Sequence, residues 1–317
     1  MSELIFLEPV FQEKIWGGNK LATVFNYELT SDKIGECWAI SAHPNGSCTI
    51  ANGKFKGLKL NELWDNHREV FGNVDGNVFP LLTKILTAAD DLSVQVHPDD
   101  EYGLANEGEL GKTECWYIIA ADEDAEIIYG HHAKNKTELA QMLEHGQWEQ
   151  LLRKVKVKAG DFFFVPSGTI HAIGKGIMIL ETQQSSDTTY RLYDYDRKDD
   201  AGNPRELHLQ QSIDVTTVPH IDAENNIEIQ QIGASSVETL VKTPFFDVYK
   251  WNIQDHVEFT KTAPYTLVSV LNGSGTIKIA DKVSEIKMGD HFIIPNDIEK
   301  WEVAGEMNLI ASNQGVK

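Results

Sequence analysis

A polar pair in an otherwise apolar segment is the first sign of chemistry in this chain. Gln95 and His97 lie two residues apart in the segment LSVQVHPDD. Residues two apart in a β-strand point the same way, so these side chains share one face, and Leu92, Val94 and Val96 share the other. The proline that follows His97 has no backbone donor and ends the strand. The pair is therefore expected at the end of a strand, on its inward face.

Three more side chains that could bind a metal or move a proton lie in other strand-like segments. Lys112 and Glu114 are two residues apart at the start of KTECWYII, and His171 follows the turn PSG after DFFFV. Two histidines and one glutamate form the donor set of many catalytic zinc sites, with a position left open. His97, Glu114 and His171 can meet inside one sandwich or barrel, where Gln95 could add a neutral oxygen. Singly, each is more often an ordinary core or surface residue, so the prediction of a metal site depends on their joint occurrence.

An arginine that could bind an anion occurs in ETQQSSDTTYRLYDYDR, residues 181–197. The segment begins as a strand with Glu181 and Gln183 on one face, and continues into a polar and aromatic cluster around Arg191. The planar guanidinium group binds carboxylates and phosphates through paired hydrogen bonds. A surface loop with Arg191 paired to an acidic neighbour is the alternative. The position shortly after His171 favours a contact with substrate.

The charge balance excludes some classes of partner. The 317 residues carry 48 acidic and 28 basic side chains, a formal net charge of −20. Nucleic acids and anionic membranes require basic surfaces, so we expect neither as a partner. Three cysteines without a CxxC pair, no apolar segment long enough to span a bilayer and no basic–apolar leader together predict a cytoplasmic protein. An anionic small substrate is compatible, provided that the site supplies its own cations.

Short segments rich in Val, Ile, Phe, Tyr and Trp, bounded by Gly and Pro, follow one another along the chain. They predict a mostly β protein built as a sandwich or barrel. Helical patterns are few and lie at 60–72, at 135–155, as one or two helices broken near Gly146, and at 205–215. The polar segment 219–236 is expected to be a connection. We therefore predict two units: a catalytic, metal-binding domain with helical segments, 1–225, and a second β domain without a metal site, 237–317.

One pattern occurs in both units. The segments KAGDFFFVPSGTIHAI (158–173) and KMGDHFIIPNDIEKW (287–301) share Lys-x-Gly-Asp, an apolar strand and a proline. Such self-similarity predicts two related β units. The first copy contains His171, whereas the second has Glu299, Lys300 and Trp301 in the corresponding region. We expect only the first copy to contribute to a metal site.

Several of these segments together resemble the type I mannose-6-phosphate isomerases. They are KIWGG, GECWAISAHP, FPLLTKILTAADDLSVQVHPDD, KTECWY, PSGTIHAI and ETQQSSDTTYRLYDYDR. The resemblance is to the short bacterial form, strong over about residues 5–215 and weak beyond. GDFFFVPSGTIHAI also resembles the second cupin motif, while QVH replaces the usual HxH of the first. The resemblance implies a mostly β fold of two cupin-type jelly-roll domains, β-sandwiches or barrels with a few helices.

The resemblance also implies roles for individual residues. One zinc ion per chain would be bound by three side chains: His97, Glu114 and His171. Gln95 would be a fourth ligand or a substrate contact. Arg191 matches the family's catalytic arginine, Lys112 matches a lysine of the substrate pocket, and Lys84, in FPLLTKIL, matches another lysine of the motif, expected to contact substrate.

The implied reaction interconverts mannose 6-phosphate and fructose 6-phosphate through a cis-enediol, with the metal stabilising charge on the sugar oxygens. The base would be Lys112, if burial and neighbouring cations lower its pKa, or a zinc-bound hydroxide. Arg191 stays protonated and would stabilise charge or hold the phosphate. Two alternatives stay open. One is another cupin metalloenzyme, either a different sugar-phosphate isomerase or an Fe(II) oxygenase, and the other is a non-catalytic sugar-phosphate-binding protein.

Overall fold

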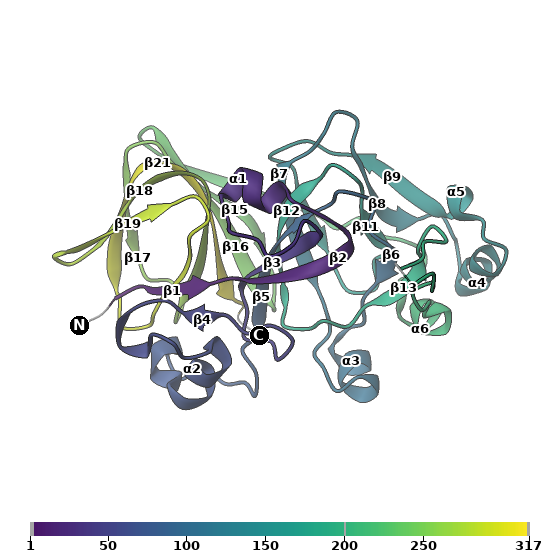
Figure 1. Cartoon of the computed structure of the whole chain (residues 1–317), viewed down its shortest axis with the longest axis horizontal. Helices are drawn as coiled ribbons and strands as arrows, with labels where there is room; N and C mark the ends of the chain where they lie inside the picture. The colour runs from purple at the N-terminus through teal and green to yellow at the C-terminus, as the bar shows by residue number, and fades with distance from the viewer. Residues whose placement is uncertain (1–2, 200, 316–317) are drawn as a thin grey trace.

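Antiparallel strands build three sheets in the computed structural model, which describes residues 3–199 and 201–315. The six-stranded sheet has the order β10 (Phe162–Val165), β7 (Glu114–Ala120), β12 (Met178–Gln184), β5 (Leu81–Thr87), β3 (Ile34–Ile40) and β2 (Val10–Gly18). The five-stranded sheet has the order β13 (Tyr190–Tyr193), β6 (Val94–Val96), β11 (His171–Ile173), β8 (Glu126–His131) and β9 (Leu152–Lys156). These two sheets form the first sandwich, on the right of Figure 1.

The third sheet is formed mainly by the C-terminal residues. Its main path is β14 (Glu228–Ile232), β15 (Ser235–Lys242), β16 (Phe246–Ile253), β21 (Lys300–Gln314), β18 (Thr266–Ile279), β20 (His291–Ile294), β1 (Ile5–Glu8) and β4 (Thr49–Ile50). Two further strands join it, β17 (His256–Thr260) on β21 and β19 (Lys282–Lys287) on β18. The N-terminal strand β1 therefore lies in this second sandwich, and the chain then crosses to the first as β2 (Figure 1).

Three apolar layers hold the sheets together. Inside the first sandwich, the facing sheets enclose Trp16, Leu86, Trp116, Ile173 and Ile179. Inside the second lie Trp251, Val268, Phe292, Val303 and Leu309. A third layer joins the sandwiches, because Cys37, Leu81, Ile85 and Leu180 of the six-stranded sheet share one cluster with Phe246, Val248 and Ile310. The six-stranded sheet is thus covered on both faces.

Double coverage explains why three of its strands do not alternate between apolar and polar residues. Every residue of β3, β5 and β12 is buried. Charged side chains in these strands are therefore removed from bulk water, and each needs a compensating partner. Lys84 in β5 and Glu181 in β12 are such residues, and they lie opposite each other in the strand register.

Helices cover the outer face of the five-stranded sheet. They are α4 (Lys136–Glu144), α5 (Trp148–Leu151) and α6 (Leu209–Val215), and they share an apolar cluster with Val94 and Val96. Val94 and Val96 therefore lie on the face opposite Gln95 and His97, as predicted. Leu92 precedes β6 and packs instead in the core between the sheets, so its predicted facing was wrong.

The predicted mostly β architecture is confirmed, and the sheets form open sandwiches rather than closed barrels. The helix expected at 60–72 is α2 (Leu60–Asn66) followed by the 3₁₀ turn η2 (Arg68–Phe71). The one or two helices expected at 135–155, with a break near Gly146, are α4 and α5, and α5 ends early because β9 begins at Leu152. The prediction that 219–236 is a connection was only partly correct, since β14 and the start of β15 lie in it. The short helices α1 (Lys20–Phe25) and α3 (Asp100–Asn106) were not predicted.

The described residues contain no helix long and apolar enough to cross a membrane. The three cysteines are buried free thiols.

Candidate metal centre and substrate cleft

Three strands of the first sandwich bring the predicted metal-binding side chains together. His97 directly follows β6, Glu114 begins β7, and His171 begins β11. Because β6 pairs with β11, Gln95 lies opposite His171. Among the described residues, one group of His, Cys, Asp and Glu side chains has donor atoms close enough to hold a metal, all within 4.8 Å of one another: His97, Glu114 and His171.

The carboxylate of Glu114 lies between the two imidazoles. His97 Nε2 is 3.5 Å from Glu114 Oε2, and His171 Nε2 is 3.3 Å from Glu114 Oε1. All three residues have no more than 1% of their surface exposed. The amide of Gln95 reaches the same cluster, since its Nε2 lies 3.4 Å from His171 Nε2. The four side chains thus converge on one buried point.

Backbone carbonyls orient both imidazoles. His97 Nδ1 donates to the carbonyl oxygen of Thr188 at 2.9 Å, and His171 Nδ1 donates to that of Thr169 at 2.9 Å. With the proton on Nδ1, each Nε2 presents its lone pair to the cluster. Burial holds the pKa of His97 well below its usual value and lowers the pKa of His171 to about 4. Both imidazoles are therefore neutral near pH 7, the form that binds metals.

The donor set fits a divalent metal in its chemistry. Glu114 Oε2 is fully buried, and the cation beside it is the Lys112 ammonium group, 3.1 Å away. A buried carboxylate needs such a positive partner, which either a lysine or a metal ion can supply. Two neutral imidazoles and one carboxylate are the ligands that zinc and Fe(II) sites use.

Lys112 places its ammonium group against these donor atoms. Its Nζ lies 3.1 Å from Glu114 Oε2 and 3.1 Å from His97 Nε2. Burial alone would lower the pKa of Lys112, but Glu114 and then Glu181 outweigh it and raise the pKa above its usual value. A catalytic base near neutral pH needs a lowered pKa. The protein groups around Lys112 do not by themselves lower its pKa.

A second buried charge network adjoins the cluster and was only partly anticipated. Lys84 Nζ lies 3.7 Å from Glu181 Oε1 and 4.0 Å from Glu36 Oε2. Trp116 Nε1 donates to both Glu114 Oε1 and Glu181 Oε2, so the indole bridges the two networks. Burial, and then the charge of Glu114, raise the pKa of Glu181. Glu36 and Glu181 could have been suspected as charged residues within strongly apolar strands.

Arg191 reaches the cleft from β13. It lies opposite Gln95 in the strand register, its Nε donates to Ser93 Oγ at 3.2 Å, and its Nη1 donates to the carbonyl oxygen of Glu206 at 2.9 Å. The guanidinium group is half-buried. It makes no ion pair with a neighbouring acid among the described residues, in contrast to the surface-loop alternative. Nearby Arg205 is instead held by Asp194.

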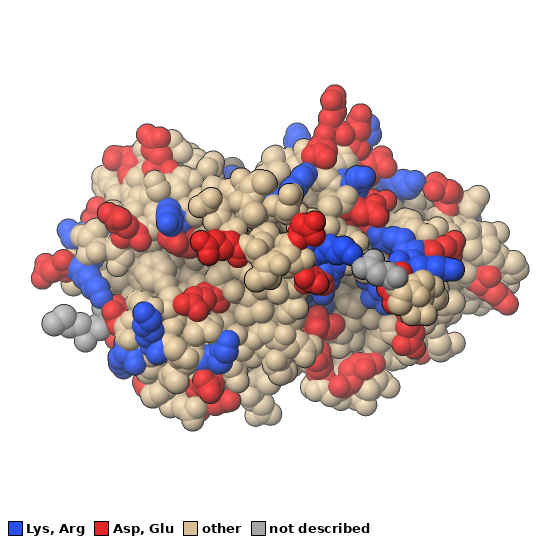
Figure 2. Space-filling model, in the orientation of Figure 1, with Lys and Arg blue, Asp and Glu red and all other residues tan. Residues whose placement is uncertain are grey.

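The predicted site residues Lys84, Gln95, Lys112 and Arg191 line one cleft. Its other charged residues are Lys14, Arg205, Glu36, Glu181 and Asp187, so five basic side chains face three acidic ones. Figure 2 shows Lys and Arg side chains gathered on the surface of the first sandwich, whereas acidic side chains are scattered over most of this face. The acidic protein thus contains a locally cationic cleft, suited to an anionic substrate.

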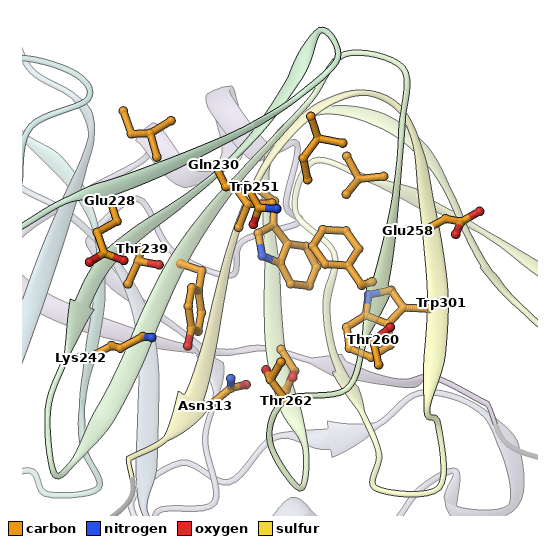
Figure 3. A pocket seen from close by; sticks show the side chains of 17 residues that line it. Glu228, Gln230, Thr239, Lys242, Trp251, Glu258, Thr260, Thr262, Trp301 and Asn313 are labelled. Atoms are coloured by element: carbon orange, nitrogen blue, oxygen red, sulfur yellow. The ribbon is translucent and has the colours of Figure 1, made fainter.

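A different cavity, of about 520 Å³, opens in the second sandwich (Figure 3). Its rings include Trp251, Phe259 and Trp301, and the centroids of Trp251 and Phe259 are 4.3 Å apart. Its lining contains no histidine or cysteine, and Glu258 lies across the cavity from Glu228 (Figure 3). The residues that line this cavity offer no metal-binding cluster, unlike the first sandwich, where His97, Glu114 and His171 meet.

Known proteins resemble this chain along its whole length. Residues 4–124 match the model of phosphomannose isomerase type I, catalytic domain, and residues 236–314 match mannose-6-phosphate isomerase, cupin domain. A mannose-6-phosphate isomerase of Streptococcus mutans is 58% identical over 99% of both chains. The crystal structure of a mannose 6-phosphate isomerase from Bacillus subtilis has a TM-score of 0.96 and 52% identity, covering 99% of this chain and 100% of that one.

Proposed function

Because the chain belongs to the type I mannose-6-phosphate isomerases, we propose that it interconverts mannose 6-phosphate and fructose 6-phosphate at its His–Glu–His cluster, with one zinc ion per chain. The observation that carries the metal proposal is the convergence of His97, Glu114 and His171 in a buried cluster within 4.8 Å. When bound there, zinc would act as a Lewis acid that stabilises negative charge on the sugar oxygens of a cis-enediol.

Lys112 is our candidate for moving the proton between C2 and C1 of the open-chain sugar. It lines the cleft, and its ammonium group lies beside the metal-binding atoms, 3.1 Å from Glu114 Oε2. It can act as a base near neutral pH only when the charge of Glu114 is compensated, because Glu114 and Glu181 otherwise raise its pKa. Metal binding and base activation are thus coupled through one carboxylate.

Arg191 is our candidate for binding the anionic parts of the substrate. Two of its nitrogens are fixed by Ser93 and Glu206, and its Nη2 has no hydrogen-bond partner within the described residues. A guanidinium group fixed in this way stabilises an enediolate or a phosphate without having to reorganise. Gln95 and Lys84 line the same cleft and would complete the substrate contacts.

A coupled assay of fructose 6-phosphate formation from mannose 6-phosphate tests this proposal. We expect activity in the purified enzyme, its loss after chelation and its return with Zn²⁺. Glu114→Gln should lose both metal and activity, whereas the control Glu238→Gln removes a carboxylate paired with Lys250 in the second sandwich and should lose neither. Bound metal without turnover would support a sugar-phosphate-binding protein, and Fe(II)-dependent consumption of O₂ would support an oxygenase.

A further inference from the structure

The hydrogen bond that orients His97 depends on a loop rather than on a strand. Its acceptor is the carbonyl oxygen of Thr188, in the irregular segment 185–189 between β12 and β13. Loop backbones are generally more mobile than strands, because no ladder of hydrogen bonds holds them. Some other contact must fix Thr188 if its carbonyl is to hold the imidazole in one orientation.

Glu109 provides that contact. Its Oε2 accepts hydrogen bonds from Ser186 Oγ at 3.1 Å, from the backbone N–H of Asp187 at 3.0 Å and from Thr188 Oγ1 at 3.1 Å. Its Oε1 lies 3.4 Å from His43 Nε2, and His43 is buried. One carboxylate oxygen therefore binds three consecutive residues of the loop, and charge-assisted bonds of this kind are stronger than neutral ones.

Glu109 is itself in a segment anchored by hydrogen bonds to the residues that follow His97. Two residues later, Gly111 N–H donates to Asp100 Oδ1 at 3.0 Å, and Lys112 N–H donates to the carbonyl oxygen of Pro98 at 2.9 Å. Pro98 directly follows His97. The segment that carries Lys112 and the loop that orients His97 are thus joined through the side chain of Glu109.

We propose that Glu109 is a positioning residue for the metal centre. By holding the loop 185–189, it fixes the carbonyl of Thr188, which keeps the proton of His97 on Nδ1 and its Nε2 toward Glu114. This inference rests on the metal centre of the proposed function. Loss of a hydrogen bond made directly to a metal ligand typically weakens metal binding by about 10- to 100-fold. Glu109 acts on the bond of His97 through the loop, so Glu109→Ala is expected to raise the dissociation constant for Zn²⁺ by about tenfold, the lower end of that range.

Two matched variants separate this role from general effects of charge and stability. Glu109→Gln keeps an oxygen that can accept from the loop, so its affinity should lie between those of the wild type and Glu109→Ala. Glu101→Ala removes an equal charge from an exposed position on the nearby helix α3 and should bind Zn²⁺ like the wild type. Affinities are measured by competition with a chromophoric chelator, and thermal melts of the metal-free proteins check folding.

A second measurement needs no metal. In ¹⁵N-histidine-labelled, metal-free protein, His97 should be the Nδ1–H tautomer in the wild type and in Glu101→Ala, and a mixture of tautomers in Glu109→Ala. Equal Zn²⁺ affinity and an unchanged His97 tautomer in folded Glu109→Ala would overturn the inference. If the wild-type protein bound no Zn²⁺, the proposed metal centre would be wrong, and the tautomer would still decide whether Glu109 positions His97.

Discussion

Replacing Lys84 by methionine should destabilise the metal-free protein by about 3–5 kcal/mol, the usual cost of leaving a buried charge without its partner. Lys84 is 3% exposed, and its Nζ lies 3.7 Å from Glu181 Oε1. At an effective dielectric constant of about 20, charges 3.7 Å and 4.0 Å apart attract by about 4 kcal/mol each. Burial of the ammonium group offsets part of this attraction, and methionine keeps most of the side-chain volume.

The control is Lys14→Met. Lys14 Nζ lies 3.3 Å from the same Glu36, but its side chain is 30% exposed. Lys14 keeps more contact with water than Lys84, which screens its charge, so this variant should lose clearly less stability than Lys84→Met. The comparison isolates burial as the source of the larger effect.

The assay is urea unfolding in the presence of a chelator, followed by circular dichroism at pH 7.5 and pH 5.5. Burial, and then Glu114, already raise the pKa of Glu181, and loss of Lys84 raises it further. A raised pKa means that Glu181 takes up its proton at a higher pH, which reduces the cost of losing Lys84, so the difference between Lys84→Met and the wild type should shrink as the pH falls. A difference below about 1 kcal/mol at pH 7.5, or one that grows on acidification, would refute this reasoning.

Three further predictions concern other parts of the cleft. Gly111→Ala should lower both kcat and the melting temperature, because an added Cβ would lie 2.3 Å from the backbone carbon of Asp99 and displace the segment of Lys112; unchanged kcat would contradict this. Arg191→Lys should lower kcat/KM by about 100-fold in the coupled assay while the circular dichroism spectrum stays the same, since lysine cannot keep the planar set of donors. Although burial opposes it, Lys84 and then Lys14 lower the pKa of Glu36 to about 2 from 4.5. Its contribution, on the order of 3 kcal/mol, is complete above pH 4.5 and is lost as the pH falls through 2, so in acid unfolding Glu36→Gln should show a shallower loss of stability than the wild type.

Local patterns predicted the elements that carry the site better than they predicted its surroundings. The period of two in a strand was enough to put Gln95 and His97 on one inward face, and the cluster of Glu114 with His171 confirms that these segments meet. The same rule could not show that Glu181 lies opposite Lys84, because strand register depends on pairing between distant segments.

The elements that were missed have physical reasons. β14 reads EIQQI and lies exposed at a sheet edge, so its polar residues resemble a loop. β9 follows α5 without a break, and no proline or glycine marks the change from helix to strand. The pairing of β1 with β20 joins residues nearly 300 positions apart, which no local pattern reveals. No pattern in the sequence pointed to Glu109, because its proposed role depends on the loop 185–189, which reaches it only in the folded protein.

The buried charges of the first sandwich are themselves an argument for chemistry at this site. A buried ion pair is often no better for stability than apolar residues of the same volume. The six-stranded sheet nevertheless buries the side chains of Lys84, Glu181 and Glu114, beside the equally buried Lys112. Four such groups in one region are therefore hard to explain by stability alone, and they suit the proposed reaction, which would bind a cation, move a proton and develop negative charge. The double variant Lys84→Met/Glu181→Met should therefore be less destabilised than Lys84→Met alone and inactive in the coupled assay, whereas retained activity would show that this network is structural.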